Sequence, residues 1–142
     1  MNPVSDLSVL LKTLEPVLNP GVFVFASVRD GHALDPAVIV ASIREPEGLS
    51  VITSATDAAI NGLSVLFKCA WITLTVNSAL NAVGLTAAFA SALGHSGISC
   101  NVVAGAYHDH IFVPLELAQT AMQVLRQLQT DGGIAQQPAD RA

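Results

Sequence analysis

The stretch CAWITLTV at residues 69–76 determines how the second half of the chain folds. Its residues alternate, so Ile72, Leu74 and Val76 point to one face of a strand while Trp71, Thr73 and Thr75 point to the other. We next expect a helix that begins at Gly84 and ends at Gly94 and Gly97. Two strands and a last helix follow it. The two strands cover residues 98–105 and 110–114, and the last helix covers 116–129. This order of elements predicts an α+β fold of the ferredoxin-like class, an antiparallel sheet with helices on one face.

The first half of the chain adds a helix capped by Ser5, three strands and a second helix capped by Thr56. We expect the strands at 22–28, 37–43 and 49–53, the last two joined as a hairpin, and the second helix at 57–61. The second half lacks a fourth strand, which must come from elsewhere in the chain or from a partner. Since the first half would end on the strand that begins the second, the sequence predicts two interlocked ferredoxin-like units. We place them at residues 1–67 and 68–129, followed by a disordered tail at 130–142.

Composition excludes several classes of function. Of the 142 residues, 51% are hydrophobic and only 12% are charged, but no apolar run reaches the ~18 residues that a membrane helix needs. The N-terminal residues lack the features of a signal peptide, so we expect a cytoplasmic protein without a membrane partner. The net charge of −5 and the scattered basic residues argue against a nucleic-acid partner.

Cys69 and Cys100 have no CxxC spacing, and the 110–114 strand is expected between the strands that they open. Two sheet spacings separate such residues by about 9–10 Å, which is beyond the ~7 Å limit for a disulfide. We therefore expect two free thiols and no zinc site.

The low charge content also suggests that part of the surface is covered by another subunit. The strand face opposite the helices carries several side chains that the two helices cannot cover, namely Trp71, Thr73, Val103 and Phe112. We therefore expect a homo-oligomer, with a dimer as the default.

Several strings together resemble the small tandem ACT-domain proteins of bacteria. They are IREPEGLS at 43–50, AWITLTVNS at 70–78, AVGLTAA at 82–88, GISCNVVAG at 97–105 and YHDHIFVP at 107–114. The resemblance covers roughly residues 5–129. It implies βαββαβ-type modules that bind amino acids or other small metabolites, regulate enzymes, and pair through sheets or helices.

The loop at 77–83 and the helix start at Gly84 are the strongest candidate site. A helix N-terminus offers unpaired N–H groups and a partial positive charge, which suit a carboxylate. The resemblance implies that effectors bind at this loop, beside the second strand of the unit. The predicted ligand-binding residues are Asn77, Leu80, Val83, Gly84, Leu85, Thr86, Asn101 and Val102.

In this interpretation Gly84 and Leu85 bind a carboxylate through their N–H groups, and Asn77 or Asn101 binds an ammonium. The apolar side chains at 80, 83 and 85 exclude water. Alternatively, Gly84 only permits a tight turn and Asn77 caps the helix.

The triplet His108, Asp109 and His110 is a second candidate, because residues i and i+2 of a strand share a face and could bind a metal. Turn formation explains Asp109 equally well. The leading hypothesis is a non-catalytic regulatory or sensor protein that binds a small molecule, an amino acid, without a cofactor or metal. One alternative is a metal-dependent or acid–base enzyme that uses this triplet, and another is a purely structural interaction module.

Overall fold

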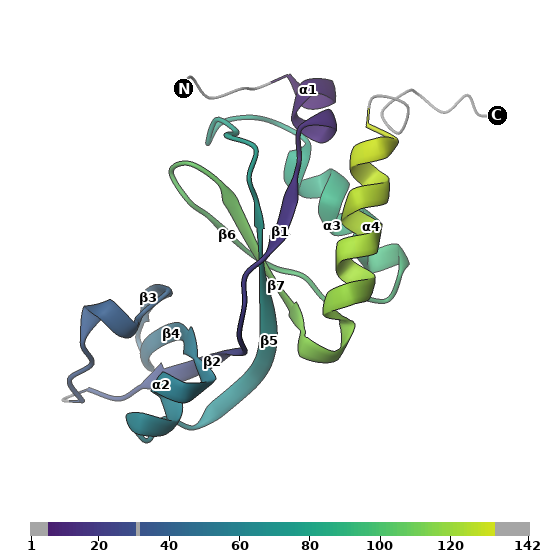
Figure 1. Cartoon of the computed structure of the whole chain (residues 1–142). Helices are drawn as coiled ribbons and strands as arrows, with labels where there is room; N and C mark the ends of the chain where they lie inside the picture. The colour runs from purple at the N-terminus through teal and green to yellow at the C-terminus, as the bar shows by residue number, and fades with distance from the viewer. Residues whose placement is uncertain (1–5, 31, 133–142) are drawn as a thin grey trace.

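The computed structural model describes residues 6–30 and 32–132, which form one antiparallel seven-stranded sheet with helices (Figure 1). The strand order is β3-β4-β2-β5-β7-β6, and β1 pairs with β5 beside this path. The strands are β1 Pro16–Leu18, β2 Phe23–Val28, β3 Ala41–Glu45, β4 Gly48–Ser54, β5 Val65–Leu74, β6 Asn101–Ala104 and β7 Asp109–Pro114. The helices are α1 Leu7–Lys12, α2 Ala55–Ile60, α3 Leu85–His95 and α4 Ala118–Thr130, with 3₁₀ turns at Pro36–Val38 and Leu115–Leu117.

Strand β5 is shared by both halves of the chain. One edge of its first half pairs with β2, from Val65 to Cys69, and the same edge further along pairs with β1, from Ile72 to Leu74. Its other edge pairs with β7. The prediction of two interlocked ferredoxin-like units is confirmed, and β1 is the fourth strand that the second half lacked.

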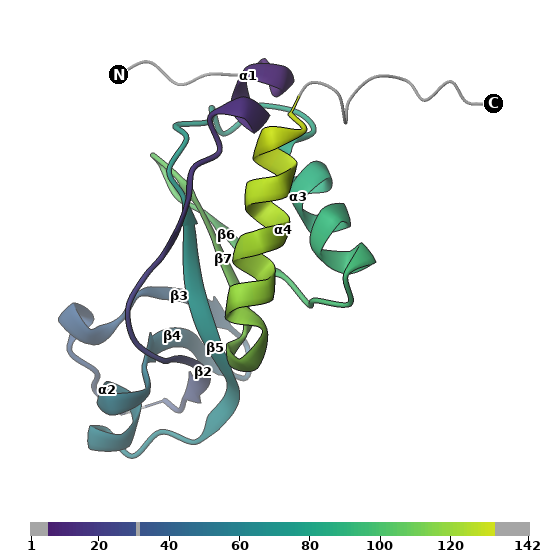
Figure 2. The ribbon, with the colours of Figure 1, turned by 45° about the vertical axis from the view of Figure 1, so that its right-hand side comes forward.

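The main core lies between one face of the sheet and helices α3 and α4, and α1 packs at the end of this layer (Figure 2). Ile72 and Leu74 point into it, as their alternation predicts. Their fully buried partners include Leu10, Leu11, Phe89, Leu93, Ile111, Val113 and Leu125. Burying each such side chain contributes about 1.5–3 kcal/mol, so this layer is the main source of stability. Within the described residues, no helix is long and apolar enough to span a membrane.

The opposite face of the sheet carries an aromatic cluster of Phe23, Phe25, Phe67, Trp71 and Phe112. The rings of Phe25 and Phe112 meet edge to face, with centroids 5.7 Å apart. Phe112 is fully buried, although the helices lie on the other side of the sheet. The expectation that only a partner subunit could cover this face is therefore wrong for Phe112. The sheet bends so that β3 and β4 approach β6, and the chain covers part of this face itself.

Helix starts differ from the sequence-based expectation by a few residues. Asp6, not Ser5, caps α1, because its carboxylate accepts a hydrogen bond from the N–H of Val9 at 3.2 Å; Ser5 lies outside the described residues. Ser54, not Thr56, caps α2 by accepting from the N–H of Asp57.

Strand starts also differ from the expectation. The strand expected at 37–43 begins only at Ala41, because Asp35 caps a 3₁₀ turn that starts at Pro36. The strand expected at 98–105 begins only at Asn101, since the N–H of Ile98 bonds to the carbonyl of Leu93 and closes α3. Of the expected tail, Thr130 is still helical, and residues 133–142 lie outside the described part.

Candidate functional site

Five of the eight predicted ligand-binding residues line two cavities, which lie near the two ends of the short strand β6. Leu80, Leu85 and Thr86 line a cavity of about 70 Å³, here the α3 cavity, with Ala104 at the end of β6. Asn101 and Val102, at the start of β6, line a cavity of about 210 Å³ between β6 and the β3–β4 hairpin. We call it the inter-arm cavity, the two arms being the first and the second half of the chain. The structure therefore does not bring Asn101 and Val102 to the 77–86 loop.

The remaining loop residues are placed differently from the expectation. Asn77 is half-buried and is not among the residues that line the α3 cavity. Val83 is 83% exposed and Leu80 is 73% exposed, whereas Leu85 is buried in the main core. Of the three apolar side chains expected to exclude water, only that of Leu85 is enclosed.

Gly84 is the N-cap of α3, so the alternative in which Asn77 caps this helix is wrong. Its φ of +102° is a left-handed conformation, and no side chain caps the helix at this position. A Cβ at Gly84 would lie 3.0 Å from Cδ2 of Leu7. Backbone conformation and packing therefore suffice to explain the glycine. The first N–H groups of α3 have no partner within the helix, which leaves a positive end at Leu85 and Thr86.

Asp109 is the charged group that lines the α3 cavity. It begins β7 on the same face as Ile111 and Val113, and it is buried at 8% exposure. The hydroxyl of Ser78 donates to its Oδ2 over a long 3.5 Å. Burial raises the pKa of Asp109, and the Ser78 bond and the nearby histidines offset only part of this effect. The α3 cavity thus has a buried carboxylate on one wall and a helix N-terminus on another.

His110 lies on the opposite face of β7, where its imidazole contacts the Trp71 ring. The indole N–H of Trp71 donates to Nδ1 at 3.0 Å, and Thr73 Oγ1 lies 3.1 Å from the same nitrogen. Thr73 in turn accepts from the side-chain amide of Asn19 at 2.9 Å. An Nδ1 that accepts a hydrogen bond belongs to a neutral ring with its proton on Nε2. Burial lowers the pKa of His110, the charge of His108 lowers it further, and the charge of Asp109 offsets part of this effect.

The triplet at 108–110 therefore does not converge on one site. Asp109 faces Ser78, His110 faces Trp71, and Nδ1 of His108 lies 3.4 Å from the carbonyl of Val76. Among residues 6–30 and 32–132, no three His, Cys, Asp or Glu side chains gather as metal ligands do. The enzyme alternative loses the arrangement on which it depended.

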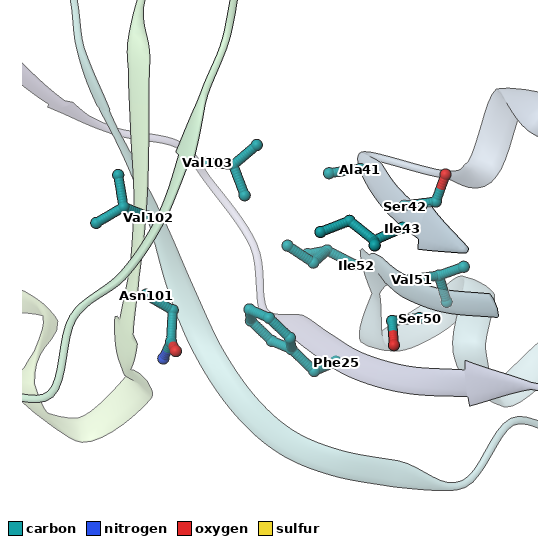
Figure 3. A pocket seen from close by; sticks show the side chains of 10 residues that line it. All are labelled: Phe25, Ala41, Ser42, Ile43, Ser50, Val51, Ile52, Asn101, Val102 and Val103. Carbon is teal, nitrogen blue, oxygen red and sulfur yellow. The ribbon is translucent and has the colours of Figure 1, made fainter. Parts of the chain in front are cut away.

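The inter-arm cavity is lined by residues from both halves of the chain (Figure 3). Phe25, Ile43 and Ile52 point into it from the first half, and Val103 points into it from β6. Sequence reasoning found its residues 101 and 102 but missed Val103 and all the lining residues of the first half. Alternation shows which face each residue occupies, but only the bend of the sheet brings β3 and β6 together.

Sequence reasoning also missed Ser78, Asp109 and Ala104 as a group. The sequence did contain a signal for Asp109, because alternation along the strand places it on the same face as Ile111 and Val113. A carboxylate at an inward position of an apolar strand is costly to bury and commonly has a partner or a function.

Comparison with known proteins places both halves of the chain in one family. Residues 2–70 and residues 66–127 each match a model of the ACT domain. A crystal structure of a protein of unknown function from Vibrio cholerae, described as a possible transport protein, is 46% identical with a TM-score of 0.76. The match covers 87% of this chain and 95% of that one. No curated protein matches the chain.

More distant structures share the fold. A protein from Agrobacterium tumefaciens is 17% identical over 80% of this chain and 87% of its own, with a TM-score of 0.67. The ligand-free regulatory subunit of aspartate kinase from Thermus thermophilus is 10% identical over 80% of this chain and 95% of its own, with a TM-score of 0.60. With two ACT-domain matches in tandem and a relative at 46% identity, the chain belongs to the ACT-domain family.

Proposed function

We propose that the protein is a non-catalytic regulator or sensor that binds a free amino acid in the α3 cavity. The observation that carries this proposal is the presence of Asp109 and the uncapped start of α3 on the walls of one cavity. An α-amino acid carries an ammonium and a carboxylate one carbon apart, and these two walls are complementary to that pair of charges.

Asp109 takes the role that the sequence-based interpretation assigned to Asn77 or Asn101. A buried carboxylate with a raised pKa gains from a cationic partner, because an ammonium offsets the cost of burying its charge. The carboxylate of the ligand binds at Leu85 and Thr86, the first residues of α3. A cavity of about 70 Å³ accommodates the charged head of the ligand, and its side chain extends along the exposed Leu80.

The regulatory part of the proposal rests on family membership, because ACT domains are modules that couple a small ligand to the state of a protein. We place the protein in the cytoplasm, where its two free thiols, Cys69 and Cys100, are stable.

The test is a thermal-shift screen of free amino acids, with ethylamine and propionate as analogues that each keep only one of the two charges. Only the zwitterion is expected to raise the melting temperature. Saturation at about one hundred times the dissociation constant stabilises the fold by about 2.7 kcal/mol.

Asp109→Asn is expected to abolish this shift. Asp30→Asn, which removes the same charge from an exposed turn, is the matched control and is expected to preserve it. The proposal is wrong if no amino acid shifts the transition, or if Asp109→Asn responds like the control.

A further inference from the structure

We propose that the inter-arm cavity is a second binding site, selective for an uncharged and mainly apolar small molecule. Its volume of about 210 Å³ is three times that of the α3 cavity. It lies at the other end of β6 and shares no lining residue with the α3 cavity.

The chemistry of the walls favours an uncharged ligand over a charged one. Phe25, Ala41, Ile43, Ile52 and Val103 point toward one another across the cavity (Figure 3). None of the ten lining residues is ionisable. An ionised group moved from water to such walls would lose hydration without gaining an oppositely charged partner, whereas an apolar ring gains by leaving water. A free amino acid therefore does not fit this site.

Asn101 supplies the polar end of the site. It lies on the same face of β6 as Val103 and lines the cavity with an amide that can both donate and accept a hydrogen bond. The hydroxyl of Ser50 is already committed to the carboxylate of Glu45. The expected ligand is therefore a small alcohol, ketone or amide with an aliphatic or aromatic body.

Occupation of this site links the two halves of the chain. Phe25, Ile43 and Ile52 belong to the first half, while Asn101 and Val103 belong to the second. A molecule that contacts both sets holds β3 and β6 at a fixed separation. Phe25 also contacts Phe112, whose ring stacks on Trp71 at 6.1 Å, so binding alters the surroundings of the only tryptophan.

The test uses three probes of one shape, namely cyclohexanol, cyclohexylammonium and cyclohexanecarboxylate at neutral pH. Cyclohexanol is expected to change Trp71 fluorescence saturably. At a cyclohexanol concentration ten times the dissociation constant, the melting temperature should rise by about 4 °C or more. The two charged probes are expected to bind at least tenfold more weakly. Equal responses to all three probes would overturn the proposal.

Variants then locate the binding. Ala41→Leu and Val103→Phe fill the cavity and are expected to abolish the cyclohexanol response, while Ala87→Leu on the exposed face of α3 preserves it. Asn101→Leu keeps the apolar walls but loses one hydrogen bond, so affinity for cyclohexanol should fall about three- to tenfold. Binding that survives both filling variants contradicts the assignment.

Amide NMR shifts of the unmodified protein give a test that does not depend on any variant folding. Cyclohexanol should perturb residues 41–43, 50–52 and 101–103, and perturbations confined elsewhere would refute the site. Asp109→Asn should leave cyclohexanol binding intact, so this proposal and the proposed amino acid site can fail independently.

Discussion

Alanine at Gly84 is expected to destabilise the protein by about 2 kcal/mol. An L-residue in a left-handed conformation costs about 1–2 kcal/mol, and the φ of +102° lies well beyond the left-handed minimum near +57°. The added Cβ would also lie 3.0 Å from Cδ2 of Leu7. Because Leu7 is half-buried and its methyl group can move, this contact adds less than the backbone does.

Two other glycines at the end of α3 serve as matched controls. Gly97 has a φ of +73°, and its Cβ would meet nothing within 4 Å, so Gly97→Ala should cost only about 1 kcal/mol. Gly94 lies within the helix with open space around its Cα, so Gly94→Ala should stabilise by about 0.5–1 kcal/mol.

Urea denaturation with a common m-value measures the three changes on one scale. The expected order of stability is Gly94→Ala, the unmodified protein, Gly97→Ala and then Gly84→Ala. For a chain of this size the Gly84 variant should melt about 4–8 °C lower. If Gly84→Ala is as stable as Gly97→Ala, the structural account of Gly84 is refuted. A bulky residue at Gly84 is thus a poor probe of ligand binding, since it disturbs the fold first.

Further outcomes are expected from pH, thiol and mass measurements. Since burial raises the pKa of Asp109, its ionised form lowers the free energy of unfolding at neutral pH. The urea concentration at the unfolding midpoint should therefore be higher for Asp109→Asn than for the unmodified protein at pH 7, and the same for both near pH 3. Since burial lowers the pKa of His110, the unfolded chain binds a proton at a higher pH than the folded protein does. The free energy of unfolding should therefore fall as the pH is lowered from about 7 to 5, and it should fall less in His110→Gln. Burial raises the pKa of Cys69 and of Cys100 to about 11, so both thiols should react slowly at pH 8 in the folded protein and titrate as two free thiols in denaturant; a single reactive thiol would contradict this. Light scattering should give at least twice the chain mass of 14.7 kDa; a monomer at micromolar concentration would contradict the expected homo-oligomer.

The parts of the fold that were predictable depend on local patterns. Alternation in residues 69–76 identified the strand and correctly assigned Ile72 and Leu74 to the core. The hairpin between β3 and β4 followed from its turn residues, and the Glu45–Gly48 pairing confirms it.

The parts that were missed depend on contacts between distant residues. Pro16–Leu18 has three residues beside a turn and no pattern of its own, and it becomes a strand only by pairing with Ile72–Leu74. The inter-arm cavity depends on the bend of the sheet, which no local pattern encodes. Turn formation explained Asp109 as well as a metal site did, because Asp favours turns through local backbone hydrogen bonds. In the structure Asp109 is a buried strand residue on the same face of β7 as Ile111.

The sharing of β5 constrains how the chain folds while it is being synthesised. The proposed boundary between the units, after residue 67, lies inside this strand, so the first unit has no complete sheet until residue 69 has left the ribosome. Strand β1 stays unpaired for longer, because the residues it pairs with extend to Leu74 and are synthesised later. Translation at about 5–20 residues per second leaves the open edges of β1 and β2 exposed for seconds. A premature stop before β5 therefore yields a fragment with unpaired strand edges, the kind of surface that chaperones bind and that otherwise aggregates.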